Sequence, residues 1–347
     1  MKSYSKNDLY DISELEIKRI WDYFYNNIES ILKYKDLYNN MMSVFGKCPD
    51  YIQECAIENN FFSVPDIYYK ASEDIGKKLS EIILCKNDYD IYDVLECLAM
   101  QGGKYAVSTF IELNKNNELK KNLSEYHFEN IIHMYANIGG WDFDDFGNKI
   151  VLIYDNCVSI RKSEYKNNVL NFFNVIDNIC PRCGNNMVNI VSVDCNNDML
   201  KFLNLEGIIT VSCCIDCVCY YEYYSKYNVD GTNKPIFDKE LIDNAVTNSN
   251  DEGMINFLQD IRGYSDNNFF TLDSISSSVF YSSYDWEENS IGGFAHWVDD
   301  ANYTKCPECG KTMKYLMQVN NDLILSGSLY ICICSDCCIT SVSYQQT

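Results

Sequence analysis

Eight of the 18 cysteines form four C-x-x-C pairs, and this spacing is the strongest chemical signal in the sequence. Two thiolates separated by two residues on a tight turn can both reach one ion at ~2.3 Å. Four thiolates complete a closed tetrahedron that leaves no position for water, which is the arrangement of structural zinc sites. The sequence therefore predicts two structural Zn²⁺ ions, with the ligands Cys180, Cys183, Cys214 and Cys217 in one site and Cys306, Cys309, Cys334 and Cys337 in the other.

The two sets of cysteines belong to an internal repeat. In each copy, C-P-x-C-G is followed by a Met and an apolar run, then by a glycine, a strand-like stretch and C-x-D-C. Thirty residues separate the pairs in the first copy and 24 in the second. The first copy is more ambiguous, because Cys213, Cys214, Cys217 and Cys219 allow more than one pairing. The same ligands also suit an iron site or redox pairs, but thioredoxin-type motifs need a βαβ context that this sequence does not predict.

Composition limits the class of protein. The chain has 347 residues with 47% hydrophobic residues, enough for two domains with real cores. We expect a cytoplasmic protein without membrane contact, because no apolar stretch reaches the roughly 20 residues of a membrane helix and the first residues are polar. The remaining cysteines are expected to be reduced and mostly buried.

The formal net charge is −22, and two tetrathiolate zinc sites would take it to about −26. Such a field repels phosphate backbones and favours a basic protein partner. A nucleic-acid-binding zinc ribbon is therefore the weakest of the functional alternatives.

Periodicity predicts an α+β fold, with a helical domain over residues 1–140 and a β-rich domain over 141–347 that holds the duplicated knuckles at 180–217 and 306–337. Apolar residues recur at helical spacing in the first third of the chain. Ser13 and Glu16 have capping-box spacing. The helices are expected at 13–45, 49–59, 65–85, 90–100, 104–114 and 124–137. Trp141 opens a predicted hairpin whose turn contains Gly147-Asn148, and residues 228–289 are expected to form an ordered connector.

The chain resembles the YwqG-like family, a bacterial domain without assigned chemistry. The resemblance is carried by Ile291–Asp299, by the segment from Tyr303 to Gln318, and by the closing segment from Cys334-Ser-Asp-Cys337 to Tyr344-Gln-Gln-Thr347. Long members carry segments like Met100-Gln-Gly-Gly and Gly140-Trp141. Ala295 and Asp299 depart from the Pro and Gln that the family tends to have. The resemblance implies a β-rich zinc fold, and some members look like immunity proteins beside toxin genes.

No phosphate-binding loop, nucleophile elbow or H-E-x-x-H motif is present. His127 and His133 stand six apart, which does not place them on one helix face. His296 and the acidic residues near 285–300 form the alternative, a hydrolase or transferase site. Residues 281–304 contain no Lys or Arg, which favours docking of a basic, toxin-like protein. The residues expected to bind it are Trp286, Glu287, Glu288, Trp297, Asp299 and Asp300.

Overall fold

A computed structural model describes residues 4–85, 91–116, 130–237, 252–277, 289–321 and 325–346. An N-terminal helical region precedes a β-rich region, so the predicted α+β fold class is confirmed. The chain divides into two compact units. The helical unit comprises Met1–Ile153, Ser276–Tyr284 and Asp300–Asn302, and the β-rich unit comprises Tyr154–Ile275, Asp285–Asp299 and Tyr303–Thr347.

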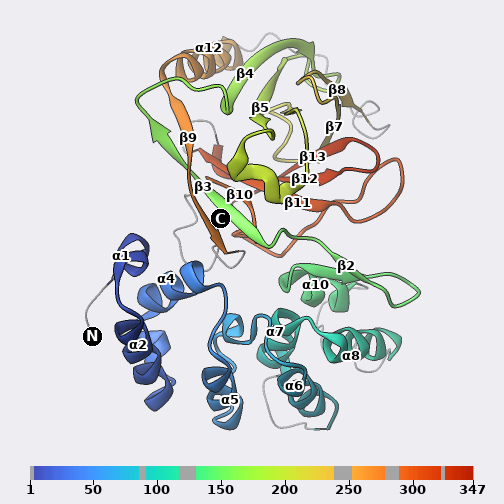
Figure 1. The fold of residues 1–347 in the computed structure, drawn as a ribbon. Coiled ribbons are helices and arrows are strands. Elements are labelled where there is room, and N and C mark those ends of the chain that lie inside the picture. Colours follow the sequence, from blue (N-terminus) through green and yellow to red (C-terminus); the bar gives the residue numbers. More distant parts are fainter. Residues whose placement is uncertain are drawn as a thin grey trace. The chain divides into compact units, whose positions relative to one another are not determined.

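The described helical unit consists of short helices and one hairpin (Figure 1). Its elements are α1 (Lys6–Asp11), α2 (Glu14–Asn26), α3 (Ser30–Lys33), α4 (Lys35–Phe45), α5 (Asp50–Glu58), η1 (Pro65–Tyr68), α6 (Glu73–Cys85), α7 (Ile91–Gln101), α8 (Lys104–Lys115), α10 (Ile131–Ile138), β1 (Trp141–Phe143) and β2 (Lys149–Val151). The Ser13 hydroxyl caps α2 by accepting a hydrogen bond from the Glu16 N–H. The long helix expected over 13–45 is instead three helices, because the chain leaves helical geometry at Asn27 and at Tyr34.

Several of the predicted segments are only partly described, because residue 90 of the helix expected at 90–100 and residues 322–324 of the second knuckle lie outside the described residues. Residues 124–129 of the helix expected at 124–137 lie outside the described residues, and α10 covers most of the remainder. Within the expected connector, residues 238–251 and 278–288 also lie outside them.

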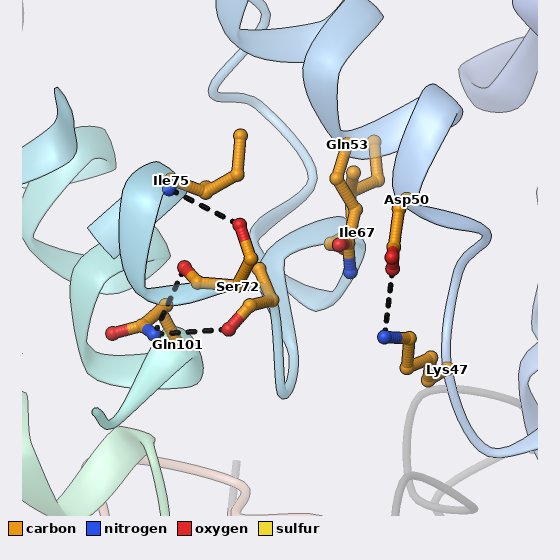
Figure 2. Close-up of polar contacts among 8 residues, drawn as sticks. Lys47, Asp50, Gln53, Ile67, Ser72, Ile75 and Gln101 are labelled. Carbon is orange, nitrogen blue, oxygen red and sulfur yellow. Dashed lines mark hydrogen bonds and ion pairs between the residues drawn. The ribbon is translucent and has the colours of Figure 1, made fainter. Parts of the chain in front are cut away.

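Polar side chains join the middle helices of the helical unit. Figure 2 shows Gln101, at the end of α7, donating to the Ser72 carbonyl oxygen; it also donates to that of Ala71. The Ser72 hydroxyl in turn accepts from the Ile75 N–H in the first turn of α6. On α5, Gln53 donates to the Ile67 carbonyl oxygen in η1 at 2.9 Å. The bonds to the Ile75 N–H and the Ile67 carbonyl oxygen thus pair backbone groups at helix ends, where a helix leaves such groups without a partner of its own.

Trp141 fixes the β1–β2 hairpin against α7. Its indole Nε1–H donates to the Ala99 carbonyl oxygen at 2.8 Å, and the side chain is fully buried. A Cβ at Gly139 would lie 2.0 Å from that same oxygen, so this position has no room for any side chain. The hairpin pairs Trp141 with Val151, and its loop contains Gly147 in the left-handed region, at φ 85°.

The β-rich unit contains an eight-stranded and a three-stranded sheet in its described residues. Its elements are β3 (Asn156–Ser163), β4 (Leu170–Ile179), β5 (Asn186–Asp194), η2 (Asp198–Leu203), β6 (Ile208–Cys213), β7 (Tyr223–Tyr227), β8 (Asn233–Ile236), α12 (Glu252–Asn267), β9 (Phe269–Ser277), β10 (Asn289–Gly292), β11 (Lys314–Asn321), β12 (Leu325–Cys334) and β13 (Ile339–Gln345). The larger sheet has the order β8-β7-β13-β12-β11-β10-β3-β9, and the smaller has β4-β5-β6. The helix α12 packs on β4 (Figure 1).

The sequence repeat is also a repeat of strands. In each copy a C-x-x-C turn leads into an antiparallel strand pair, β5–β6 in the first and β11–β12 in the second. The strand after the last cysteine is β7 in the first copy and β13 in the second, and these two pair antiparallel with one another. Two neighbouring antiparallel strands are related by a local two-fold axis. The corresponding strands β7 and β13 of the two copies are therefore related by such an axis.

The close approach at Gly139 gives a testable consequence. Gly139→Ala should lower the free energy of unfolding by about 3 kcal/mol, because the new methyl group overlaps the Ala99 carbonyl and displaces Trp141. Gly263→Ala in α12 is the control, because its added Cβ meets nothing within 4 Å and should stabilise the helix by about 0.5–1 kcal/mol. Thermal and urea unfolding measure both, and equal effects of the two variants would contradict this packing.

Candidate metal centres

The first metal centre gathers four sulfur atoms from two turns. Cys180 and Cys183 lie between β4 and β5, and Cys214 and Cys217 follow β6. Their sulfurs all lie within 4.8 Å of one another. Three of the four residues are almost fully buried, with exposed fractions of 0% for Cys180, 1% for Cys214 and 4% for Cys217.

The second metal centre has the same composition but is less covered. Cys306 and Cys309 precede β11, whereas Cys334 and Cys337 lie at the turn between β12 and β13. The four sulfurs again lie within 4.8 Å of one another, and those of Cys309 and Cys334 are 3.8 Å apart. Cys309 is exposed, although Cys306 is only 2% exposed.

Both centres use the same backbone turn. The Gly184 N–H donates to the Cys180 carbonyl oxygen at 2.9 Å, and the Gly310 N–H donates to that of Cys306 at 2.8 Å. Both glycines adopt positive φ, at 75° and 71°, which a side chain would strain. The turn directs backbone N–H groups toward sulfur, and the Lys311 N–H lowers the pKa of the Cys309 thiol.

The sulfurs of each centre are electrostatically coupled. In the first centre, hydrogen bonding with Cys183 lowers the pKa of Cys180, whereas hydrogen bonding with Cys180 raises the pKa of Cys214. The four groups cannot all be thiolates at this separation without a cation, because like charges repel. Each centre can therefore hold a metal ion, and its donor set of four soft thiolates suits zinc or iron rather than magnesium or calcium.

The ambiguous cysteines of the first copy take distinct positions. Cys214 and Cys217 are in the sulfur cluster, and the Val218 N–H closes their turn on the Cys214 carbonyl oxygen at 2.9 Å. Cys213 is the last residue of β6, paired with Val188, and Cys219 is exposed. Neither of them is in the cluster of four.

Sequence reasoning missed Tyr223. Its hydroxyl lies 3.2 Å from the Cys180 sulfur, and burial raises the pKa of Tyr223, so the hydroxyl keeps its proton and can donate to a thiolate. The signal was weak, because Tyr223 follows Cys217 by six residues, beyond the C-x-x-C turn itself.

The cations near the knuckles have other partners. Lys311 pairs with Asp336 at 2.8 Å and so joins the two turns of the second centre. In the first centre, the corresponding contact runs from Asn185 to Asp216 at 3.4 Å. The Arg182 guanidinium lies 4.1 Å from the ring centroid of Tyr221, and the Lys314 amine lies 3.9 Å from that of Tyr154. These cations thus brace the turns or stack on rings.

The segment expected to bind a partner is only partly described. Trp286, Glu287 and Glu288 lie outside the described residues. Trp297 is half-buried and packs on Tyr330, with ring centroids 4.4 Å apart, while Asp299 and Asp300 are exposed.

Long side chains from the sheet hold this segment by its backbone. The Gln318 side-chain oxygen accepts from the His296 N–H at 2.8 Å, and the Tyr330 hydroxyl donates to the His296 carbonyl oxygen at 2.6 Å. The Gln345 side-chain oxygen accepts from the N–H groups of Val298 and Asp299, both at 3.1 Å.

The described histidines stand outside both sulfur clusters. The Nδ1 atom of His133 lies 2.6 Å from a carboxylate oxygen of Asp142, a contact that the sequence did not predict. The His133 ring also stacks on Phe143, with centroids 4.3 Å apart. His127 lies outside the described residues.

No family model matches the chain, so its resemblance to the YwqG-like family stays a prediction. No solved structure matches it either. Among the described residues, no helix is long and apolar enough to cross a membrane. The chain is 26% identical over 223 residues to the uncharacterized protein YpfL of Salmonella typhimurium, a match that covers 62% of this chain and 50% of that protein.

Proposed function

We propose that this protein is a zinc-stabilised binding module in which both four-cysteine centres hold structural Zn²⁺. This proposal rests on the observation that, in each of two separate sets, four cysteine sulfurs lie within 4.8 Å of one another. The cysteines form no disulfides. Reduced thiols are typical of the cytoplasm, where we place the protein. Zinc fits the tetrahedral, redox-inert role better than iron does.

The centres serve the fold and not a reaction in this proposal. Four cysteines fill the tetrahedron, so no position remains for a water or a substrate carbonyl. Each set of four sulfurs links the turn before one strand to the turn after the neighbouring strand. These two turns are distant in sequence. Metal binding then contributes free energy of folding, on the order of 10–16 kcal/mol for structural zinc at neutral pH.

The binding role rests on charge and on exposed acidic residues. A net charge of −22 attracts basic surfaces over several ångströms and speeds their association. Asp299 and Asp300 are exposed at the end of a segment held by Gln318, Tyr330 and Gln345, so these carboxylates need little ordering on binding. We propose a basic, toxin-like protein as partner and a YwqG-like, immunity-type inhibitor as the biological class.

The metal centres predict a definite stoichiometry. Protein purified under reducing conditions should contain two zinc ions per chain by elemental analysis. Cys214→Ser and Cys337→Ser should each retain one ion and lower the free energy of unfolding by several kcal/mol, because the remaining three thiolates bind more weakly.

Adjacent cysteines provide matched controls. Cys213→Ser and Cys338→Ser should retain two ions, since neither residue belongs to a sulfur cluster. Loss of an ion in Cys213→Ser, with two ions retained in Cys214→Ser, would contradict the assigned ligands. Iron in place of zinc would contradict the identity of the metal.

The proposed docking role is tested by charge reversal. The tagged protein should recover one basic protein from native lysate near 1:1, and about 0.5 M salt should release it because exposed charges are screened within a few ångströms. Asp299→Lys should weaken this complex at least ten-fold in a titration with the purified partner. Glu206→Lys, at an exposed acidic residue in the loop after η2, should leave it within two-fold. Equal weakening by both variants would contradict a local docking surface.

A further inference from the structure

The two sulfur clusters differ in how well they are protected. In the first, Cys183 is half-exposed, whereas the other three cysteines are at most 4% exposed and belong to the main apolar core of the β-rich unit. In the second, Cys309 is exposed and Cys337 is half-exposed. Cys309 is thus the one exposed residue among the eight ligands, and a soluble oxidant reaches it without any opening of the fold.

The hydrogen bond from Tyr223 adds to this difference. A donated O–H draws electron density from the Cys180 sulfur and makes it a poorer nucleophile. Ser343 stands at the corresponding position, six residues after Cys337. Among the described residues, its hydroxyl has no hydrogen-bond partner, so it gives the second cluster no such donor.

We propose that the second centre is a peroxide-sensitive switch, with Cys309 as the attacking thiolate and Cys334 as the resolving one. This inference rests on the proposed metal binding and adds a regulatory role to one of the two centres. Cys334 is the natural resolving residue because its sulfur lies 3.8 Å from that of Cys309 across the cluster.

The chemistry balances with hydrogen peroxide as the oxidant. The Cys309 thiolate attacks a peroxide oxygen, the O–O bond breaks, and a sulfenic acid forms as the leaving hydroxide takes a proton to become water. The Cys334 thiolate then attacks the sulfenic sulfur, and the second hydroxide leaves and takes a proton from the solvent to become water. The two sulfurs give up two electrons and the peroxide takes them. Cys306 and Cys337 take up protons, and the divalent ion leaves.

Loss of this ion would also affect the segment that carries Asp299, which is proposed to bind the partner. Cys306 follows Thr304 by two residues, and the Thr304 carbonyl oxygen accepts from the Met313 N–H at 2.8 Å. The Thr304 hydroxyl also bonds to that of Ser341 on β13 at 2.5 Å. Thr304 thus lies between the ligand Cys306 and the segment that carries Asp299, and we expect release of the ion to loosen this end of the segment.

The experiment uses the full chain loaded with two zinc ions and treated with hydrogen peroxide. Native mass spectrometry should show a one-ion species that forms at least ten-fold faster than the ion-free species. Disulfide mapping of the one-ion species should find Cys309 linked to Cys334, with Cys306 and Cys337 open to alkylation. Hydrogen exchange should rise around Thr304 and stay unchanged around Cys180.

Two variants separate this mechanism from others. Cys338→Ser removes the exposed cysteine next to the centre and should leave the rate unchanged. Tyr223→Phe should speed release from the first centre several-fold, and an unchanged rate would overturn the protective role of this hydroxyl. Equal release from both centres, earlier release from the first, or slower release in Cys338→Ser would overturn the switch. Fewer than two ions before treatment would instead refute the proposed function.

Discussion

The convergence of thiolates from distant turns is the constraint on which the β-rich unit depends. Each set of four sulfurs is too close together to be fully ionised alone, because like charges repel at these distances. A divalent cation offsets this repulsion, because the thiolates of both turns are attracted to it and the two turns are thereby held together. The strands between the turns, β5–β6 and β11–β12, must then keep their register for the sulfurs to meet.

The duplicated copies do more than provide two similar sites. Because β7 and β13 pair with each other, the strand that leaves one centre is hydrogen-bonded to the strand that leaves the other. The Lys226 amine on β7 also forms an ion pair at 2.9 Å with Glu308, which lies between Cys306 and Cys309 in the second copy. The β7–β13 pairing therefore connects the two centres within the eight-stranded sheet, although β5 and β6 of the first copy belong to the three-stranded sheet. Of the two centres, the first lies in the main apolar core of the unit.

The sequence predicted those features that depend on neighbouring residues. C-P-x-C-G specifies a tight turn with a left-handed glycine, and both turns form with the same two hydrogen bonds. Ser13 predicted the start of α2 for the same local reason. Helix ends without such signals were missed, as at Asn27 and Tyr34, where apolar periodicity continues through the breaks.

Long-range pairings could not be predicted from one sequence. Tyr223 meets Cys180 across 43 residues, and Trp141 meets Ala99 across 42, so tertiary packing alone brings each pair together. The contact of Asp142 with His133 was not predicted, because Asp142 belongs to an acidic hairpin whose sequence is typical of a solvated surface. The exposure of Cys309 could not be predicted either, because both copies of the repeat share the same C-P-x-C-G motif.

X-ray absorption at the metal edge of the reduced, fully loaded protein tests the central claim most directly. The account predicts four sulfur neighbours at ~2.3 Å for the average ion and no oxygen or nitrogen in the first coordination sphere. A component with oxygen or nitrogen neighbours would mean that at least one centre is open to water or to another side chain. That result would contradict two closed centres with four thiolate ligands each.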